Sequence, residues 1–197
     1  DSTHDGVDEL IERARKIVEG VALATETTGE MRVTGGSYEM LSNMAGARLI
    51  QRNFERLEPM QFDADEVEFA HRIQEATGKP QSGMKTTPEP LEENPGEPEG
   101  GSTDVGDVSW VVPTLHFSVT TAPADTPWHA WPVVAAGGMS IGHKGMLYAA
   151  KAMATTLVDL YQDEETRQAI HAEWLEDKAG REYRSFLAEG PPPIPQR

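Results

Sequence analysis

The stretch Gly78–Thr103 constrains the fold most, because its residues cannot build a packed element. It contains five proline, five glycine and five glutamate residues, and Met84 and Leu91 are its only strongly hydrophobic side chains. Such a composition buries too little apolar surface to offset the entropy of ordering the chain. A connection of about 25 residues is long for a compact domain and is typical of a functional loop, a linker or disorder. We therefore predict one long loop with regular elements on either side.

Before this loop, the residue pattern predicts a helix followed by a strand. One set of apolar residues recurs at the i, i+3, i+4, i+7 spacing of an amphipathic helix face: Val7, Leu10, Ile11, Ala14, Ile17, Val18 and Val21. Met31 and Val33 then alternate with polar neighbours up to Gly35–Gly36, which predicts a half-buried strand. A helix and one strand make only half of a two-layer unit.

Two further helices are predicted between this strand and the long loop. The first covers 42–57, and the second covers 63–77, with Asp63 and Glu66 in the positions of a capping box. Gly78 follows the second helix, where a glycine commonly ends a helix.

The chain after the loop predicts a second strand and two more helices. Leu115, Phe117 and Val119 alternate with polar residues between two prolines, as in a half-buried strand. A long helix follows, in which apolar residues keep the 3.6-residue period: Leu147, Ala150, Ala154, Leu157, Val158 and Tyr161. Asp163 is placed to cap a further helix. Helices interspersed with strands predict an α/β fold.

The composition excludes several classes of protein. The 33 acidic and 17 basic residues give a formal net charge of −16, which excludes a nucleic-acid-binding scaffold because phosphates are bound by Lys and Arg. No apolar run approaches the roughly 18 to 20 residues that cross a bilayer, so we expect no membrane partner and a soluble, cytoplasmic chain. The absence of cysteine excludes thiolate nucleophiles and cysteine zinc sites. Because residue 1 is aspartate rather than methionine, we expect that a preceding part has been removed.

Two loops combine residues that could carry chemistry. Gly100–Asp107 joins glycines to hydroxyl and carboxylate groups, and Thr126–Trp131 places His129 between two tryptophans just after a strand, where α/β folds hold their sites. The surrounding block 104–161 has only four acidic and two basic residues, which predicts a buried interior. The residues alone also allow purely structural interpretations of both loops. The first loop is also typical of a turn with a helix cap, and His129 of a packed, hydrogen-bonded histidine.

The other histidines give weaker signals. His116 and His143 also fit packed side chains, and His4 and His171 are predicted at the surface. The sequence contains no HExxH or other compact metal-binding motif.

Three long motifs point to a known group of enzymes. The runs GSTDVGDVSWVVPTLHFSV, TPWHAW and SIGHKGMLYAAKAMA resemble the aminobenzoyl-glutamate utilisation protein B group of amidohydrolases. This group belongs to the co-catalytic zinc peptidase superfamily, which includes carboxypeptidase G and the hippurate and indole-acetyl-amino-acid hydrolases. The similarity extends from about Val7 to Tyr161.

The resemblance implies a fold and a division of the chain. Such enzymes have an α/β catalytic domain and a smaller inserted α+β domain that dimerises and closes over the substrate. Residues 1–40 would be the second half of the inserted domain, including its last helix and strand. Residues 41–197, with the long loop 78–103, would be the C-terminal part of the catalytic domain.

The resemblance also implies roles for particular residues. The glycine-rich loop would contribute substrate-binding groups: Gly101, Ser102, Thr103 and Asp104. Asp104 would orient other groups rather than bind metal. His129 matches the last metal ligand of the family, which lies in a loop before a long apolar helix. His143 ranks second, as a substrate contact at the start of that helix or a solvent-facing residue.

The remaining catalytic groups of the family are expected outside this chain. They are a histidine, a bridging aspartate, two acidic ligands and a glutamate that acts as general base. We therefore expect no catalytic residue in this chain, and an N-terminal portion of the same enzyme as its partner. The whole would be a homodimeric, metal-dependent amidohydrolase with two divalent ions, zinc first and manganese or cobalt as alternatives. A metal-activated water would attack the amide of an N-acyl amino acid.

Two alternatives remain open from the sequence. One is a non-catalytic binding or interaction domain derived from that fold, which predicts no bound metal even with all partner chains present. The other is a different hydrolase that uses Asp104 and Asp107 as an acid/base pair, which predicts activity insensitive to chelators.

Overall fold

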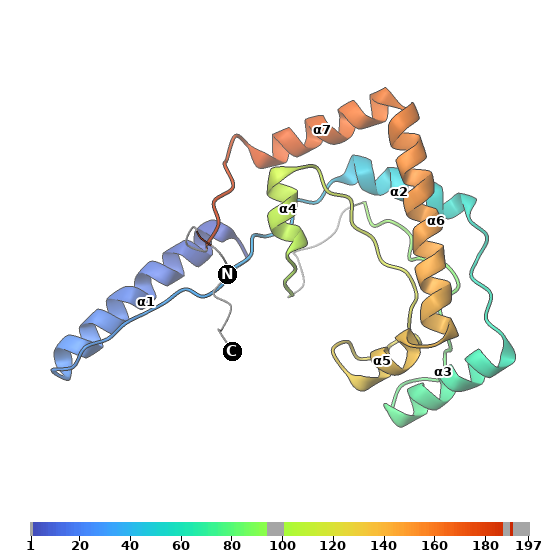
Figure 1. Ribbon diagram of the computed structural model, residues 1–197, viewed down its shortest axis with the longest axis horizontal. Coiled ribbons are helices and arrows are strands. Elements are labelled where there is room, and N and C mark those ends of the chain that lie inside the picture. Colours follow the sequence, from blue (N-terminus) through green and yellow to red (C-terminus); the bar gives the residue numbers. More distant parts are fainter. Residues whose placement is uncertain (1, 94–100, 187–189, 191–197) are drawn as a thin grey trace. The chain divides into compact units, whose positions relative to one another are not determined.

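The structure is a computed structural model that describes residues 2–93, 101–186 and 190. In that part of the chain all regular elements are helices (Figure 1). Their bounds are α1 (His4–Ala24), α2 (Met44–Arg56), α3 (Ala64–Ala76), α4 (Val105–Val111), α5 (Trp131–Gly137), α6 (Ser140–Gln162) and α7 (Glu164–Lys178).

The α/β class predicted from the sequence is therefore wrong for the described residues. The two predicted strands, 31–34 and 115–119, are present as non-helical segments that belong to no sheet. Alternating apolar and polar residues favour an extended backbone, in which successive side chains point to opposite faces. A β-strand also needs hydrogen bonds from a neighbouring strand. A neighbouring strand comes from another part of the chain, so a local pattern contains no information about it.

The helices were predicted correctly where capping and periodicity agree. The side chain of Asp63 accepts a hydrogen bond from the backbone N–H of Glu66, and the side chain of Glu66 accepts one from the N–H of Asp63, which completes the predicted capping box of α3. Asp163 accepts a hydrogen bond from the backbone N–H of Thr166 and so begins α7. These signals lie within a few residues of each other, so the sequence contains them in full.

The chain divides into two compact units. Unit 1 comprises Asp1–Ser42, Asn94–Thr114 and Ala172–Arg197, and unit 2 comprises Asn43–Glu93 and Leu115–His171. The division predicted from the family, at residues 40 and 41, stays a prediction. Of the predicted long loop 78–103, residues 94–100 lie outside the described part of the chain, and 78–93 contain no helix.

The core of unit 2 forms where α2 packs against α6. Its buried members are Ile50, Phe54, Met60, Tyr148 and Ala152. The segment 115–119 adds Leu115, Phe117 and Val119 to this core, while His116 and Ser118 are exposed. The predicted faces of this segment are thus confirmed, although its membership of a sheet is not.

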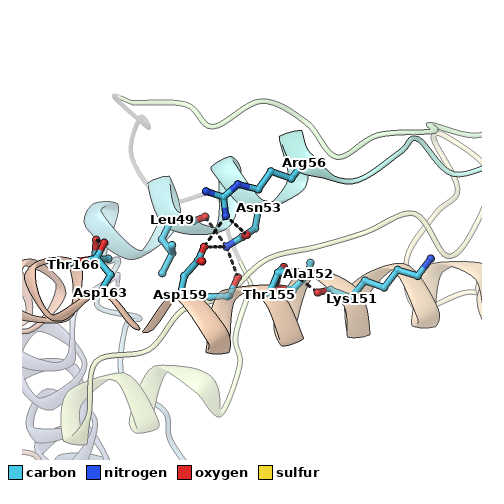
Figure 2. Close-up of polar contacts among 10 residues, drawn as sticks. Leu49, Asn53, Arg56, Lys151, Ala152, Thr155, Asp159, Asp163 and Thr166 are labelled. Atoms are coloured by element: carbon cyan, nitrogen blue, oxygen red, sulfur yellow. Dashed lines mark hydrogen bonds and ion pairs between the residues drawn. The ribbon is translucent and has the colours of Figure 1, made fainter. Parts of the chain in front are cut away.

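A polar network joins the same two helices beside this core (Figure 2). Asn53 on α2 is fully buried, and its amide Nδ2 donates to Thr156 Oγ1 at 3.3 Å and to Asp159 Oδ2 at 3.0 Å on α6. Arg56 also donates to Asp159 Oδ2, at 3.0 Å. Because buried polar groups must be paired, this network fixes how α2 lies along α6.

Helix α6 is apolar on two faces, and within the described residues only one of them is covered. The covered face carries Ile141, Gly145, Tyr148, Ala152 and Thr156. The other face carries the apolar residues that recur with the 3.6-residue period in the sequence. It is exposed, and Tyr161 at its end is 85% exposed. A helix that is apolar all round is typical of a buried position.

No helix among the described residues is long and apolar enough to span a membrane.

Candidate functional site

A buried glutamine fixes the chain that leads into the turn of His129. Gln74 on α3 is 1% exposed, and its amide nitrogen, Nε2, donates to the backbone carbonyls of Gly83 and Ala124 at 3.1 and 3.0 Å. Its Oε1 accepts from the N–H of Gly83. One side chain therefore fixes the end of α3, the loop at Gly83 and the chain that leads into the turn.

His129 itself lies in that turn, directly before α5, in an uncommon conformation. Its φ is +59°, in the left-handed region that few residues other than glycine adopt. The side chain is exposed, and the neighbouring Trp128 and Trp131 are 69% and 58% exposed. The buried environment predicted for this block is therefore wrong here. Of its three tryptophans, Trp110 is the buried one.

His143 lies near the start of α6, where its backbone N–H donates to the carbonyl of Met139. Its side chain is exposed. The prediction that it lies at a helix start is confirmed. Its role toward substrate stays a prediction.

The glycine-rich loop belongs to unit 1, whereas His129 and His143 belong to unit 2. Its four predicted site residues are exposed and run directly into α4: Gly101, Ser102, Thr103 and Asp104. Thr103 Oγ1 accepts a hydrogen bond from the N–H of Val105, and its carbonyl accepts one from the N–H of Gly106. The interpretation of this loop as a turn with a helix start thus describes its local geometry, and its part in substrate binding stays a prediction.

Gly106 allows α4 to pack closely against the backbone of Tyr38. A Cβ at this position would lie 2.1 Å from the carbonyl oxygen of Tyr38, so only glycine lets α4 approach that backbone. Trp110 on the same helix is buried, and its indole N–H donates to the carbonyl of Glu39 at 2.8 Å.

Asp107, the other member of the proposed acid/base pair, faces Tyr183. Burial raises the pKa of the Tyr183 hydroxyl, and the carboxylate of Asp107, which accepts its hydrogen bond, raises that pKa further. Asp104 is exposed at the start of α4. The two carboxylates therefore have different surroundings: Asp107 accepts a hydrogen bond from Tyr183, and Asp104 is exposed.

Sequence reasoning missed a cluster around His4, which it predicted at the surface. The imidazole stacks on the ring of Tyr38 with centroids 3.9 Å apart, and its Nε2 lies 3.0 Å from the Tyr38 hydroxyl oxygen. That oxygen also accepts a hydrogen bond from the backbone N–H of Arg184. Both partners lie far along the chain from His4, so no local signal could have indicated them.

The described residues do not make a metal centre by themselves. No three His, Asp or Glu side chains in this part of the chain gather closely enough to hold an ion. A catalytic zinc site needs about three protein ligands. The imidazole nitrogen of His129 is a donor type that zinc binds. Because this side chain is exposed, it can share an ion with ligands from another segment.

A hollow with two parts lies beside the segment 115–119 of unit 2. One part, of about 570 Å³, is lined by residues 118–128 and by Lys79, Lys85 and residues 87–89. A second part, of about 290 Å³, is lined by residues 116–118, by residues 88–92 and by α2. Both parts are lined by Pro88, Glu89 and Ser118, so they lie next to each other.

Comparison with known proteins gives a similarity that extends over nearly the whole chain. The chain is 30% identical to a subunit of the p-aminobenzoyl-glutamate hydrolase of Escherichia coli (strain K12) over 216 aligned residues. The alignment covers 96% of this chain but 44% of that protein, so the chain spans less than half of the relative's length. No family profile and no solved structure matches the chain. The resemblance predicted from the loop motifs is thereby confirmed: over nearly all of its residues, this chain is similar to one of the subunits of an aminobenzoyl-glutamate hydrolase.

Proposed function

We propose that this chain is the C-terminal portion of a metal-dependent amidohydrolase that cleaves the amide bond of an N-acyl amino acid such as aminobenzoyl-glutamate. The observation that carries the proposal is the 30% identity over 96% of the chain to a hydrolase subunit with that substrate in its name. The relative is more than twice as long as the aligned region, and the part outside that region is where we expect the remaining metal ligands.

His129 is the residue of this chain that we propose as a metal ligand. Gln74 fixes the chain at Ala124 that leads into its turn, and its left-handed backbone is a strained conformation of the kind that clusters at functional sites. A ligand held in this way needs little reorganisation to bind. Two divalent ions, zinc or alternatively manganese or cobalt, would polarise the amide carbonyl and activate water.

The other groups would be supplied from outside these 197 residues. They include the remaining ligands and the general base. Gly101, Ser102, Thr103 and Asp104, together with His143, would contact the substrate, and the whole enzyme would be a homodimer. These assignments are supported by the similarity and by the exposure of all five residues.

The proposal is tested in the full-length polypeptide that contains this chain. Metal content is measured by elemental analysis, and hydrolysis of aminobenzoyl-glutamate is measured with and without a chelator. His129→Ala should lose about one ion per chain and lower kcat/KM by at least about 100-fold, because a metal ligand is removed. His116→Ala, which changes another exposed histidine of the same unit, is the matched control and should retain both.

Two results would support the competing functions. Full-length protein without metal and without hydrolysis would favour a binding domain derived from this fold. Hydrolysis that survives the chelator but disappears in Asp107→Ala would favour the carboxylate pair of α4.

A further inference from the structure

Two of the four tryptophans are used by the fold of unit 1. The indole N–H of Trp110 donates to the carbonyl of Glu39 at 2.8 Å, and that of Trp174 donates to the carbonyl of Ser109 at 2.6 Å. A packed tryptophan usually gives its N–H a partner in this way. Structural contacts therefore account for these two residues.

The other two tryptophans, Trp128 and Trp131, lie on either side of His129 and have side chains outside the core. They are 69% and 58% exposed, and within the described part of the chain neither indole makes a hydrogen bond or a ring contact. An exposed indole leaves a large apolar surface in water, and such surfaces mark places where a ligand or another protein binds. The packing of this chain does not account for either side chain.

The hollow of unit 2 distinguishes these two indoles. Trp128 lines the part of about 570 Å³, together with Val119, Pro123 and Thr126, whereas Trp131 lines neither part. Pockets for small molecules have volumes of about 300 to 1,000 Å³ and combine apolar and aromatic walls with a few polar groups. Trp128 therefore gives an aromatic wall to a hollow of suitable size.

The chain around Trp128 is fixed on both sides. Before it, the backbone N–H and the hydroxyl of Thr126 both donate to the carbonyl of Pro123, at 3.3 and 2.6 Å, and the ring of Pro127 restricts the next φ. After it, α5 is anchored by its buried Pro132. A side chain on a turn held in this way meets a ligand with little loss of backbone freedom.

Trp128 is also the direct neighbour in the chain of His129, the metal ligand proposed above. Consecutive Cα atoms are about 3.8 Å apart, so the indole starts close to an ion bound by the imidazole. In an aminobenzoyl amino acid, the aromatic ring is attached directly to the carbonyl that such an ion would polarise. A planar ring of this kind stacks favourably, with an offset, on an indole face. The neighbouring positions of indole and imidazole thus match the neighbouring positions of ring and carbonyl.

We propose that Trp128 determines the acyl specificity of this site by stacking on the aromatic ring of an N-aroyl amino acid. The inference rests on the proposed function, and it adds the chemical class of the acyl group and the residue that selects it. A small aliphatic acyl group has no flat face and buries less apolar surface against the indole, so it gains less from the contact. Trp131, which is similarly exposed but does not line the hollow, takes no part.

The test compares two substrates in the full-length polypeptide that contains this chain: aminobenzoyl-glutamate and acetyl-glutamate, which differ only in the acyl group. Trp128→Leu should lower the ratio of their kcat/KM values at least about 10-fold, mainly through a higher KM for the aromatic substrate, because stacking acts on the bound substrate and the transition state alike. Trp128→Phe keeps an aromatic face and should keep most of the ratio. Trp131→Leu is the matched control and should leave the ratio unchanged.

Titration calorimetry with aminobenzoyl-glutamate separates this inference from the proposed function. If the full-length protein binds this compound but hydrolyses nothing, the proposed function fails, and the dissociation constants decide on Trp128. They should rise at least about 10-fold in Trp128→Leu and stay the same in Trp131→Leu.

Three results would overturn the inference. An unchanged ratio in Trp128→Leu shows that the indole does not meet the acyl group, as it would if other polypeptide covered it. An equal loss of the ratio in Trp131→Leu shows that the hollow does not select between the two indoles. Full-length protein that neither hydrolyses nor binds aminobenzoyl-glutamate overturns the inference and the proposed function together.

Discussion

The carboxylate of Glu66 on α3 accepts a hydrogen bond from the ammonium group of Lys144 on α6. Glu66 is 3% exposed, and the same oxygen, Oε2, accepts the backbone N–H of Asp63 in the capping box. Its other oxygen, Oε1, is buried and has no partner among the described residues. One side chain thus caps α3 and ties it to the beginning of α6, the helix that carries His143.

This pair predicts an acid-sensitive contribution to stability. Burial alone would raise the pKa of Glu66, but hydrogen bonds from Lys144, Ser140 and Asp63 and the charge of Lys144 outweigh it and lower the pKa below its ordinary value of 4.5. A lowered pKa in the folded state stabilises the protein above the unfolded-state value and is lost as the pH falls through the folded-state value.

The measurement is denaturant unfolding of the protein and of Glu66→Gln between about pH 7 and pH 3. The difference in unfolding free energy should be constant near neutral pH and shrink below pH 4.5, where the wild-type carboxylate takes up a proton. Glu68→Gln, an exposed change on the same helix, should show no such trend. A difference that grows toward acid would contradict the assignment.

Asn53→Ala should destabilise the protein by about 2 to 4 kcal/mol, because it leaves a cavity and removes a buried donor from Thr156 and Asp159. Arg56→Ala removes the exposed partner of the same Asp159 and should cost less than about 1 kcal/mol. Chemical denaturation with a constant m-value measures both. Equal effects would show that the amide of Asn53 does not organise the network.

Gly145→Ala should destabilise the protein by about 1 to 3 kcal/mol, since its Cβ would meet the carbonyl of Thr120 at 2.2 Å and push the segment off α6. Gly20→Ala provides the comparison. That glycine lies inside α1 with nothing within 4 Å of the added Cβ. The substitution should therefore stabilise the folded protein by roughly 0.5 to 1 kcal/mol. The two substitutions are chemically identical and should shift the thermal midpoint in opposite directions.

Gln74→Leu should loosen the turn of His129 without touching it. The substitution fills similar volume but leaves the N–H of Gly83 and the carbonyl of Ala124 without the Gln74 amide, at a cost of about 1 to 3 kcal/mol. The carbonyl of Gly83 keeps the hydrogen bond from the N–H of Ala124. Peptides that cover 122–130 should exchange their amides faster, while those of α6 remain protected. Unchanged exchange in 122–130 would show that the turn is held by other contacts.

Local patterns predicted the five longer helices, α1, α2, α3, α6 and α7, because the information for a helix lies within one or two turns, but they did not predict the short helices α4 and α5. Asp63 with Glu66, and Asp163 with Thr166, are complete signals a few residues long. The alternation at Leu115, Phe117 and Val119 also predicted which face meets the core. It could not predict whether a neighbouring strand exists, because that neighbour is not encoded in the segment itself.

The surroundings of His129 and His4 differ from those predicted, for two physical reasons. Low charge around His129 was interpreted as burial, but Trp128 and Trp131 are exposed in this chain, and apolar character does not show what covers a side chain. His4 was placed at the surface because its ring partner, Tyr38, comes from a distant position, as does Arg184, whose backbone N–H donates to the Tyr38 hydroxyl. The resemblance in the loop motifs, by contrast, extends to nearly the whole chain.

The interleaving of the two units has a consequence for how the chain can be made and cut. Unit 2 needs both 43–93 and 115–171, and unit 1 needs three separate stretches, so no single proteolytic nick releases either one intact. During synthesis on the ribosome, the apolar side chains of α2 can be buried only after α6 has emerged, because they pack against that helix. Expression of shorter fragments, which lack at least one of these stretches, should therefore yield insoluble material.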